Sequence, residues 1–109
     1  MKNWLLSIQQ PDGPPPATLD LRAILADVGA LVAEMTAAGA LVFTGGLMPA
    51  SAAAVVRGGD VQDGAYTPGP EHVGGVTIVR AVDRDEAIAW GKKLAAVIGL
   101  PVEVRGFQG

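Results

Sequence analysis

Cysteine is absent from this chain of 109 residues, which excludes disulfides, thiolate metal sites and cysteine nucleophiles. Charge is scarce as well: 17% of the residues are charged, and the formal net charge is −3 at pH 7. The eight lysines and arginines are scattered, and only Lys92 and Lys93 are adjacent. The chain therefore lacks the basic surface that neutralises nucleic-acid phosphates, and we expect no nucleic-acid partner.

Long hydrophobic runs are also missing, although hydrophobic residues make up 50% of the chain. Three glycines and Pro49 interrupt the uncharged stretch 36–55, and the N-terminus lacks the apolar region of a signal peptide. We therefore expect a cytoplasmic protein without membrane contact, folded as one domain over residues 1–109. So apolar a composition in so small a domain predicts further burial in a homodimer.

Hydrophobic periodicity predicts two helices among short strands. Apolar residues recur every three or four positions from Leu21 to Met35, and again from Ala87 to Ile98, which is typical of amphipathic helices. Thr18 or Asp20 can cap the first helix, whereas Gly99 suits the end of the second. The strands are expected at residues 2–9, 41–43, 54–57, 60–62, 76–82 and 102–105.

The order of these elements predicts an α+β fold. Two helices, each apolar on one side and separated by strands, belong on the same face of an antiparallel sheet. The ferredoxin-like split-βαβ two-layer sandwich is the simplest arrangement. Its second sheet face has no helix to cover it, which also favours a homodimer that packs two sheets together.

The stretch DGAYTPGPEHVGGV, residues 63–76, contains the only tyrosine and the only histidine of the chain. Five segments follow one another along the chain: NWLLSI, AAGALVFTGGL, the stretch 63–76, DEAIAW and VEVR. In these segments and in their order the chain resembles the YCII-related family, in its branch named for a DGPF tetrapeptide. Asp63-Gly64-Ala65-Tyr66 stands at the signature position, with the family interval of seven residues before Gly74-Gly75. Ala65 replaces the signature proline, and Tyr66 replaces its phenylalanine.

The resemblance implies a homodimer of the dimeric α/β-barrel type, with a cleft between sheet and helices. It implies no settled reaction, although the wider superfamily includes cofactor-free isomerases, and the DGPF branch is associated with alternative sigma factors. The first helix of the YCII-like branch carries a histidine that pairs with an aspartate as an acid–base pair. In this chain Val28 stands at the nearest matching position. The resemblance therefore does not imply that histidine–aspartate pair for this chain.

Five residues around this stretch are candidates for a site. Asp63 and His72 are the candidate proton-transfer groups, because a carboxylate with a raised pKa, or an imidazole, can accept a proton near neutral pH. Asp63 next to Gly64 is first of all typical of a turn, and a histidine here is more typical of a surface loop than of a general base. Tyr66, Arg57 and Glu71 are the candidate ligand-binding residues.

Metal and cofactor sites are not expected. One histidine cannot supply a tetrahedral zinc site by itself, and neither a dinucleotide-binding nor a phosphate-loop glycine pattern is present. Three functions remain open. The first is a homodimer that binds a small molecule, acidic if two arginines face one cleft. The second is a cofactor-free isomerase or lyase that uses Asp63 or His72 for proton transfer. The third is a purely structural dimer without a formed pocket.

Overall fold

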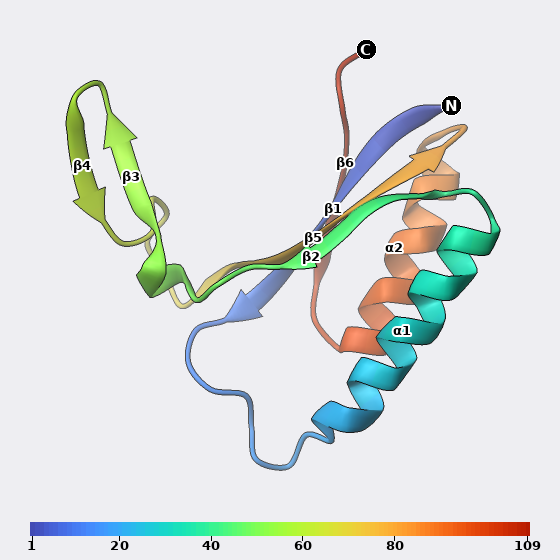
Figure 1. Cartoon of the computed structure of the whole chain (residues 1–109), viewed down its shortest axis with the longest axis horizontal. Coiled ribbons are helices and arrows are strands. Elements are labelled where there is room, and N and C mark those ends of the chain that lie inside the picture. The colour runs from blue at the N-terminus through green and yellow to red at the C-terminus, as the bar shows by residue number, and fades with distance from the viewer.

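The computed structural model describes all 109 residues. Its elements are β1 (Lys2–Pro11), α1 (Leu21–Ala37), β2 (Leu41–Gly46), a 3-10 turn η1 (Ala50–Ala52), β3 (Ala54–Arg57), β4 (Asp60–Asp63), β5 (Glu71–Ala81), α2 (Arg84–Ile98) and β6 (Val102–Gly106). Four strands form an antiparallel sheet in the order β2-β5-β1-β6. Both helices cover one face of this sheet (Figure 1), so the structure confirms the α+β, ferredoxin-like two-layer sandwich.

The helices begin at acidic caps, as the sequence suggests. Asp20, one of the two caps considered, accepts a hydrogen bond from the backbone N–H of Ala23 at 3.1 Å. Asp83 accepts one from the N–H of Glu86 at 2.9 Å, and the Glu86 carboxylate accepts one from the N–H of Val82. The Asp83 carboxylate thus satisfies a backbone donor that the first turn of α2 cannot satisfy internally, and the Glu86 carboxylate satisfies the donor of Val82, just before the cap.

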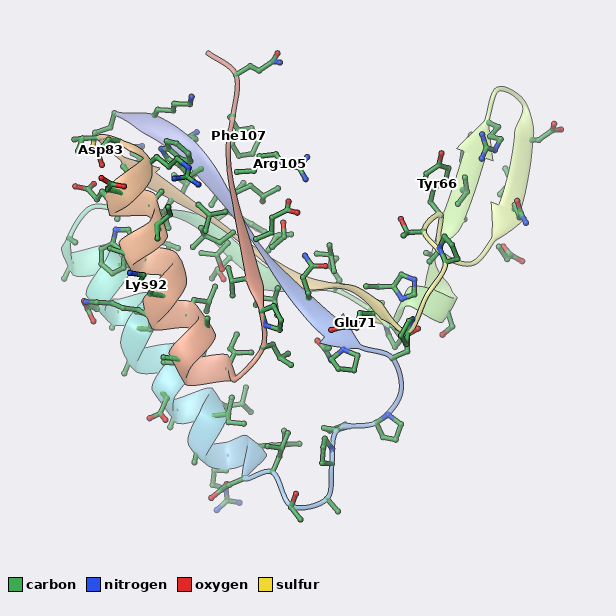
Figure 2. The ribbon with its side chains drawn as sticks, turned by 180° about the vertical axis from the view of Figure 1, so that it is seen from behind. Tyr66, Glu71, Asp83, Lys92, Arg105 and Phe107 are labelled. Carbon is green, nitrogen blue, oxygen red and sulfur yellow. The ribbon has the colours of Figure 1, made fainter.

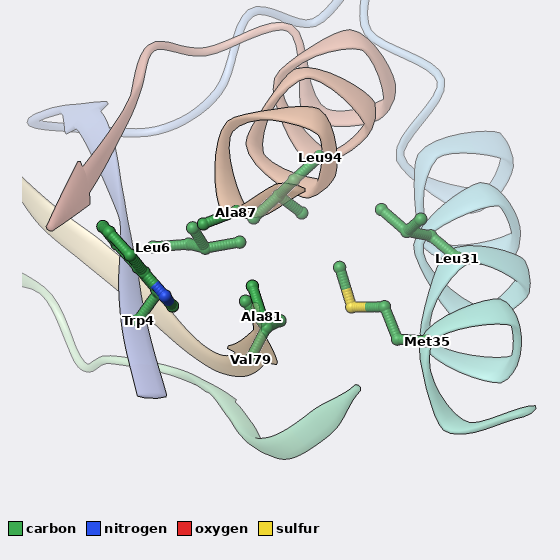
Figure 3. Close-up of a cluster of buried hydrophobic side chains, with 8 residues drawn as sticks. All are labelled: Trp4, Leu6, Leu31, Met35, Val79, Ala81, Ala87 and Leu94. Carbon is green, nitrogen blue, oxygen red and sulfur yellow. The ribbon is translucent and has the colours of Figure 1, made fainter. Parts of the chain in front are cut away.

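The core lies between the sheet and the two helices (Figure 3). Side chains of β1 and β5 meet those of α1 and α2 there, and Leu6, Met35 and Val79 are fully buried. Burying each such side chain stabilises the fold by about 1.5–3 kcal/mol. The complete cluster is Trp4, Leu6, Leu31, Met35, Val79, Ala81, Ala87 and Leu94.

The opposite face of the sheet has no covering element (Figure 1). Because side chains alternate along a strand, residues that follow the core positions point to this open face. Leu5, Val76 and Ile78 are only half-buried there, and Phe43 on β2 is 55% exposed. We call this surface the open sheet face.

β3 and β4 form a separate two-stranded sheet that projects from the body (Figure 1). The predicted hairpin is confirmed, and its turn residue Gly58 has a left-handed φ of 56° that glycine adopts without strain. A backbone hydrogen bond of 2.7 Å from Gly64 to the carbonyl of Ala53 closes its base. We call residues 53–66 the arm.

Candidate functional site

His72 lies on β5 rather than in a loop, because β5 begins at Glu71, five residues earlier than predicted. Its Nδ1 atom is 2.8 Å from Oδ1 of Asp12, just beyond the end of β1. Its Nε2 atom is 2.7 Å from the backbone carbonyl oxygen of Thr67, in the segment that joins the arm to β5. Only 16% of the His72 side chain is exposed. His72 thus holds three segments of the chain together.

Both partners of the His72 ring are acceptors. A carbonyl oxygen and a carboxylate oxygen cannot donate, so both hydrogen bonds exist only when both ring nitrogens carry a proton. The hydrogen bond to Asp12 raises the pKa of His72, and the Thr67 carbonyl and the Asp12 charge add to this, whereas desolvation opposes it. The geometry therefore favours the imidazolium form, with no ring nitrogen free to accept a proton.

A β-bulge next to His72 shapes the neighbouring surface. Ile8 pairs with Gly75 and Gln9 with Val73, so Gly74 is the extra residue on β5. A Cβ atom on Gly74 would lie 2.7 Å from Cβ of Gln10, and closer still to the amide oxygen of that side chain. The absence of a side chain at Gly74 is therefore what lets Gln10 fold against β5.

A cavity of about 290 Å³ opens at this bulge. Its wall consists of residues 10–13 at and beyond the end of β1, residues 47–51 in the link from β2 into η1, and residues 72–74 at the start of β5. Asp12, His72, Gln10 and Ser51 supply polar groups, while Leu47 and its neighbours supply an apolar side. We call this cavity the bulge pocket. Its volume is just below the usual range for small-molecule sites, about 300–1,000 Å³.

The structure separates the residues that the sequence singled out. Of the five, only His72 lines the bulge pocket. Asp63 ends β4 on the arm, and the carboxylate that contacts His72 is that of Asp12. Glu71 is exposed at the first position of β5 (Figure 2). Asp63 and His72 are therefore not placed as an acid–base pair.

Arg57 and Tyr66 are brought together, but on the arm. The Arg57 guanidinium lies over the Tyr66 ring, 5.3 Å from its centroid, and the tyrosine is 71% exposed. Arg105 is paired with Glu103 across 2.6 Å on β6. No arginine lines the bulge pocket. The pair of arginines that would bind an acidic ligand is therefore absent from this pocket.

A second cavity, of about 320 Å³, lies between α2 and the turn from α1 to β2. Arg80, Glu86, Trp90 and Lys93 line it, and Lys93 pairs with Glu34. The Glu86 carboxylate already accepts a hydrogen bond from the backbone N–H of Val82. This cavity is the one nearest to a cleft between sheet and helices, but it contains none of the five candidate residues.

Asp12 was not identified from the sequence as a site residue. It stands 60 positions before His72, in a proline- and glycine-rich segment that predicts only a stiff loop. The backbone N–H of Asp12 also bonds the carbonyl of Pro70 at 2.7 Å. No pattern of neighbouring residues predicts this contact, because it arises from the antiparallel pairing of β1 with β5.

No cluster of three or more His, Asp or Glu side chains in the structure is arranged to hold a metal ion. None of the helices combines the length and the apolar character needed to cross a membrane. Comparison of the chain with models of known protein families and with curated proteins finds no match.

Proposed function

We propose that this chain is a homodimeric member of the YCII-related family, DGPF branch, that binds a small molecule in the bulge pocket. The observation that carries this proposal is the position of His72 in the pocket wall, clamped by Asp12 and by the Thr67 carbonyl. A pocket with prearranged polar groups and a charged residue of raised pKa is the usual starting hypothesis for a binding site.

The occupied ring nitrogens favour binding over proton transfer. A general base must bring a free nitrogen within hydrogen-bond reach of the proton that it removes. In the structure both nitrogens of His72 are already committed to acceptors. A ligand instead meets a fixed imidazolium–carboxylate pair next to the Gln10 amide and the Ser51 hydroxyl.

The charge of the pocket narrows the class of ligand. The imidazolium of His72 and the carboxylate of Asp12 balance each other, and no lysine or arginine lines the cavity. The site therefore favours a small neutral molecule with hydrogen-bonding groups and an apolar part, such as an amide or a lactone. An acid would meet the Asp12 carboxylate without a spare positive charge.

An NMR titration of the single histidine tests this proposal. Small carboxylic acids, their primary amides and lactones of the same size are added while the His72 ring resonances are followed. We expect saturable shifts with an amide or a lactone, and weaker ones with the matched acid. If no compound moves His72 or its neighbours, the bulge pocket is not a binding site for these classes.

The homodimer is proposed from the surface of the chain. The chain exposes 7386 Å², whereas a compact monomer of this mass exposes about 5,700 Å². The excess, about 1,700 Å², falls within the roughly 1,000–2,500 Å² that each subunit of an obligate homodimer buries. The radius of gyration is 15.2 Å, against about 13 Å for a compact domain of this length.

The open sheet face is the surface that a second copy would cover. It combines the half-buried Leu5, Val76 and Ile78 with the exposed Phe43. Light scattering at micromolar concentration should give twice the chain mass of 11.1 kDa. A monomer at this concentration would contradict the homodimer but leave the pocket proposal standing.

The alternative is a cofactor-free isomerase or lyase. The contact between Asp12 and Nδ1 of His72 favours it, because a carboxylate orients a histidine base in many enzymes. In that case Nε2 must leave the Thr67 carbonyl before it accepts a proton. Turnover of a lactone that is lost in His72→Gln would support the enzyme; binding of the same lactone without turnover supports the binding protein.

A further inference from the structure

We propose that the arm is a docking element for a second copy of this chain, with Tyr66, stacked on Arg57, as its anchor. The proposal rests on the homodimer put forward above. It adds a second contact region to the open sheet face, and it assigns to Tyr66 and Arg57 a protein partner in place of a small ligand.

The arm lacks support within its own chain. β3 pairs only with β4, and neither strand packs on the helices or on the four-stranded sheet to any substantial extent. The cross-strand pair Val56 and Val61 remains 67% and 66% exposed. An isolated two-stranded hairpin is marginally stable in water. A projecting hairpin of this kind gains stability when another surface packs against it.

The arm lies on the same side of the four-stranded sheet as the open sheet face. In Figure 1 the helices lie on one side of the sheet, and the arm stands away from the sheet on the other side. Figure 2 shows the Tyr66 side chain beside the arm, on the side turned toward the sheet. Because Arg57 stacks on Tyr66, this pair lies on the inner side of the arm. A second copy that covers the open sheet face would therefore approach the side of the arm that carries Tyr66.

The chemistry of the pair fits a protein surface. Tyrosine and arginine are enriched at the centres of protein interfaces, since each offers a large apolar area together with hydrogen-bonding groups. The stacked guanidinium limits the motion of a ring that is 71% exposed, so less side-chain freedom is lost on docking. Asp60 and Asp63 on the same arm leave it without the basic charge that a nucleic acid or an anionic membrane requires.

The second copy is the occupant that accounts for both surfaces at once. In a two-fold symmetric dimer each subunit presents the same patches, so one arrangement covers two open sheet faces and two arms. The excess surface of the chain, estimated above, is larger than the roughly 800 Å² that one partner buries in a standard interface. It therefore leaves room for the arm in addition to the sheet.

Sedimentation equilibrium of matched single variants tests the arm separately from the sheet. Tyr66→Ala removes the anchor, Tyr66→Phe keeps the ring, and Phe43→Ala alters the open sheet face. Leu25→Ala is the control, because Leu25 is also 71% exposed but lies on α1 in the helical layer. We expect Tyr66→Ala to weaken dimerisation at least tenfold, while Tyr66→Phe and Leu25→Ala dimerise like the wild type.

The possible failures are distinguishable. A wild-type monomer would overturn the arm proposal together with the homodimer. If Phe43→Ala weakens the dimer and Tyr66→Ala does not, the arm proposal is overturned while the homodimer stands. Should Tyr66→Ala misfold, the Tyr66 ring resonances of the wild-type chain decide instead. They shift on dilution through the dissociation range if the arm docks, and stay unchanged if it does not.

Discussion

Gly74→Ala is the substitution that most directly tests how the bulge builds the pocket. The new Cβ atom would lie 2.7 Å from Cβ of Gln10. The Gln10 amide can rotate away, but its Cβ is fixed to the backbone of β1. The two strands must therefore move apart at the bulge, and the wall of the pocket moves with them.

The expected magnitude follows from a comparison with Gly46→Ala. Gly46 lies in β2 of the same sheet, has open space where a Cβ would stand and has no left-handed φ. Both substitutions reduce the entropy of the unfolded chain, which stabilises each variant by about 0.4–1 kcal/mol. Only Gly74→Ala adds the cost of overpacking, about 1–3 kcal/mol. The two variants should differ in free energy of unfolding by that second amount.

Urea denaturation followed by tryptophan fluorescence measures this difference. With a slope of about 1–3 kcal/mol per molar urea, the midpoint of Gly74→Ala should fall about 1 M below that of Gly46→Ala. The His72 ring resonances should also shift in Gly74→Ala, since His72 lies two residues from the bulge. Gln10→Gly, which removes the opposing Cβ, should cost less stability in the Gly74→Ala background than in the wild type.

Equal midpoints for the two alanine variants would refute this reasoning. So would Gln10→Gly costing the same in the Gly74→Ala background as in the wild type. Either result would mean that β1 and β5 separate at the bulge without cost. The close approach of Gln10 to Gly74 would then not be what shapes the pocket.

Three further predictions concern His72, the core and the start of α2. The native pKa of His72 is raised above 6.5, so its stabilising contribution is complete below about pH 6.5 and is lost as pH rises through the native pKa. Urea midpoints measured from pH 6 to 8 should therefore fall in the wild type, and this component should be absent from His72→Gln. Leu6→Ala removes a fully buried side chain and should cost about 2–5 kcal/mol in thermal unfolding, whereas an unchanged melting temperature would contradict the assigned core. Asp83→Ala removes the acceptor for the Glu86 N–H and should cost about 0.5–2 kcal/mol, and Asp83→Asn, which keeps an acceptor, should lose less.

Several elements could be predicted because their signals are local. The periodicity of α1 and α2 predicts which side of each helix faces the sheet, and Asp83 and Gly99 mark where α2 begins and ends. It does not decide how deep each side chain lies, since Leu31 and Met35 of α1 are buried whereas Leu21 and Leu25 stay exposed. Gly58-Gly59 predicts the turn of the arm for the same reason, since only neighbouring residues decide its backbone angles. The uncovered sheet face follows from two helices on one side of a sheet, although what covers it stays a prediction.

The site depended on contacts that no local pattern contains. β5 extends back to Glu71 because its first residues pair with the end of β1, and this pairing turns an expected loop histidine into a clamped one. The bulge at Gly74 shifts the register so that His72 pairs with Gln10, and the chain beyond Pro11 then brings Asp12 to the ring. Sequence alone thus determined the type and order of the elements, the caps of α2 and the two-layer arrangement, because periodicity and turn chemistry act within a few residues. The tertiary structure alone decided that His72 meets Asp12 and that Asp63, Tyr66 and Arg57 stand apart on an arm, because strand register and hairpin orientation depend on residues far apart in the chain.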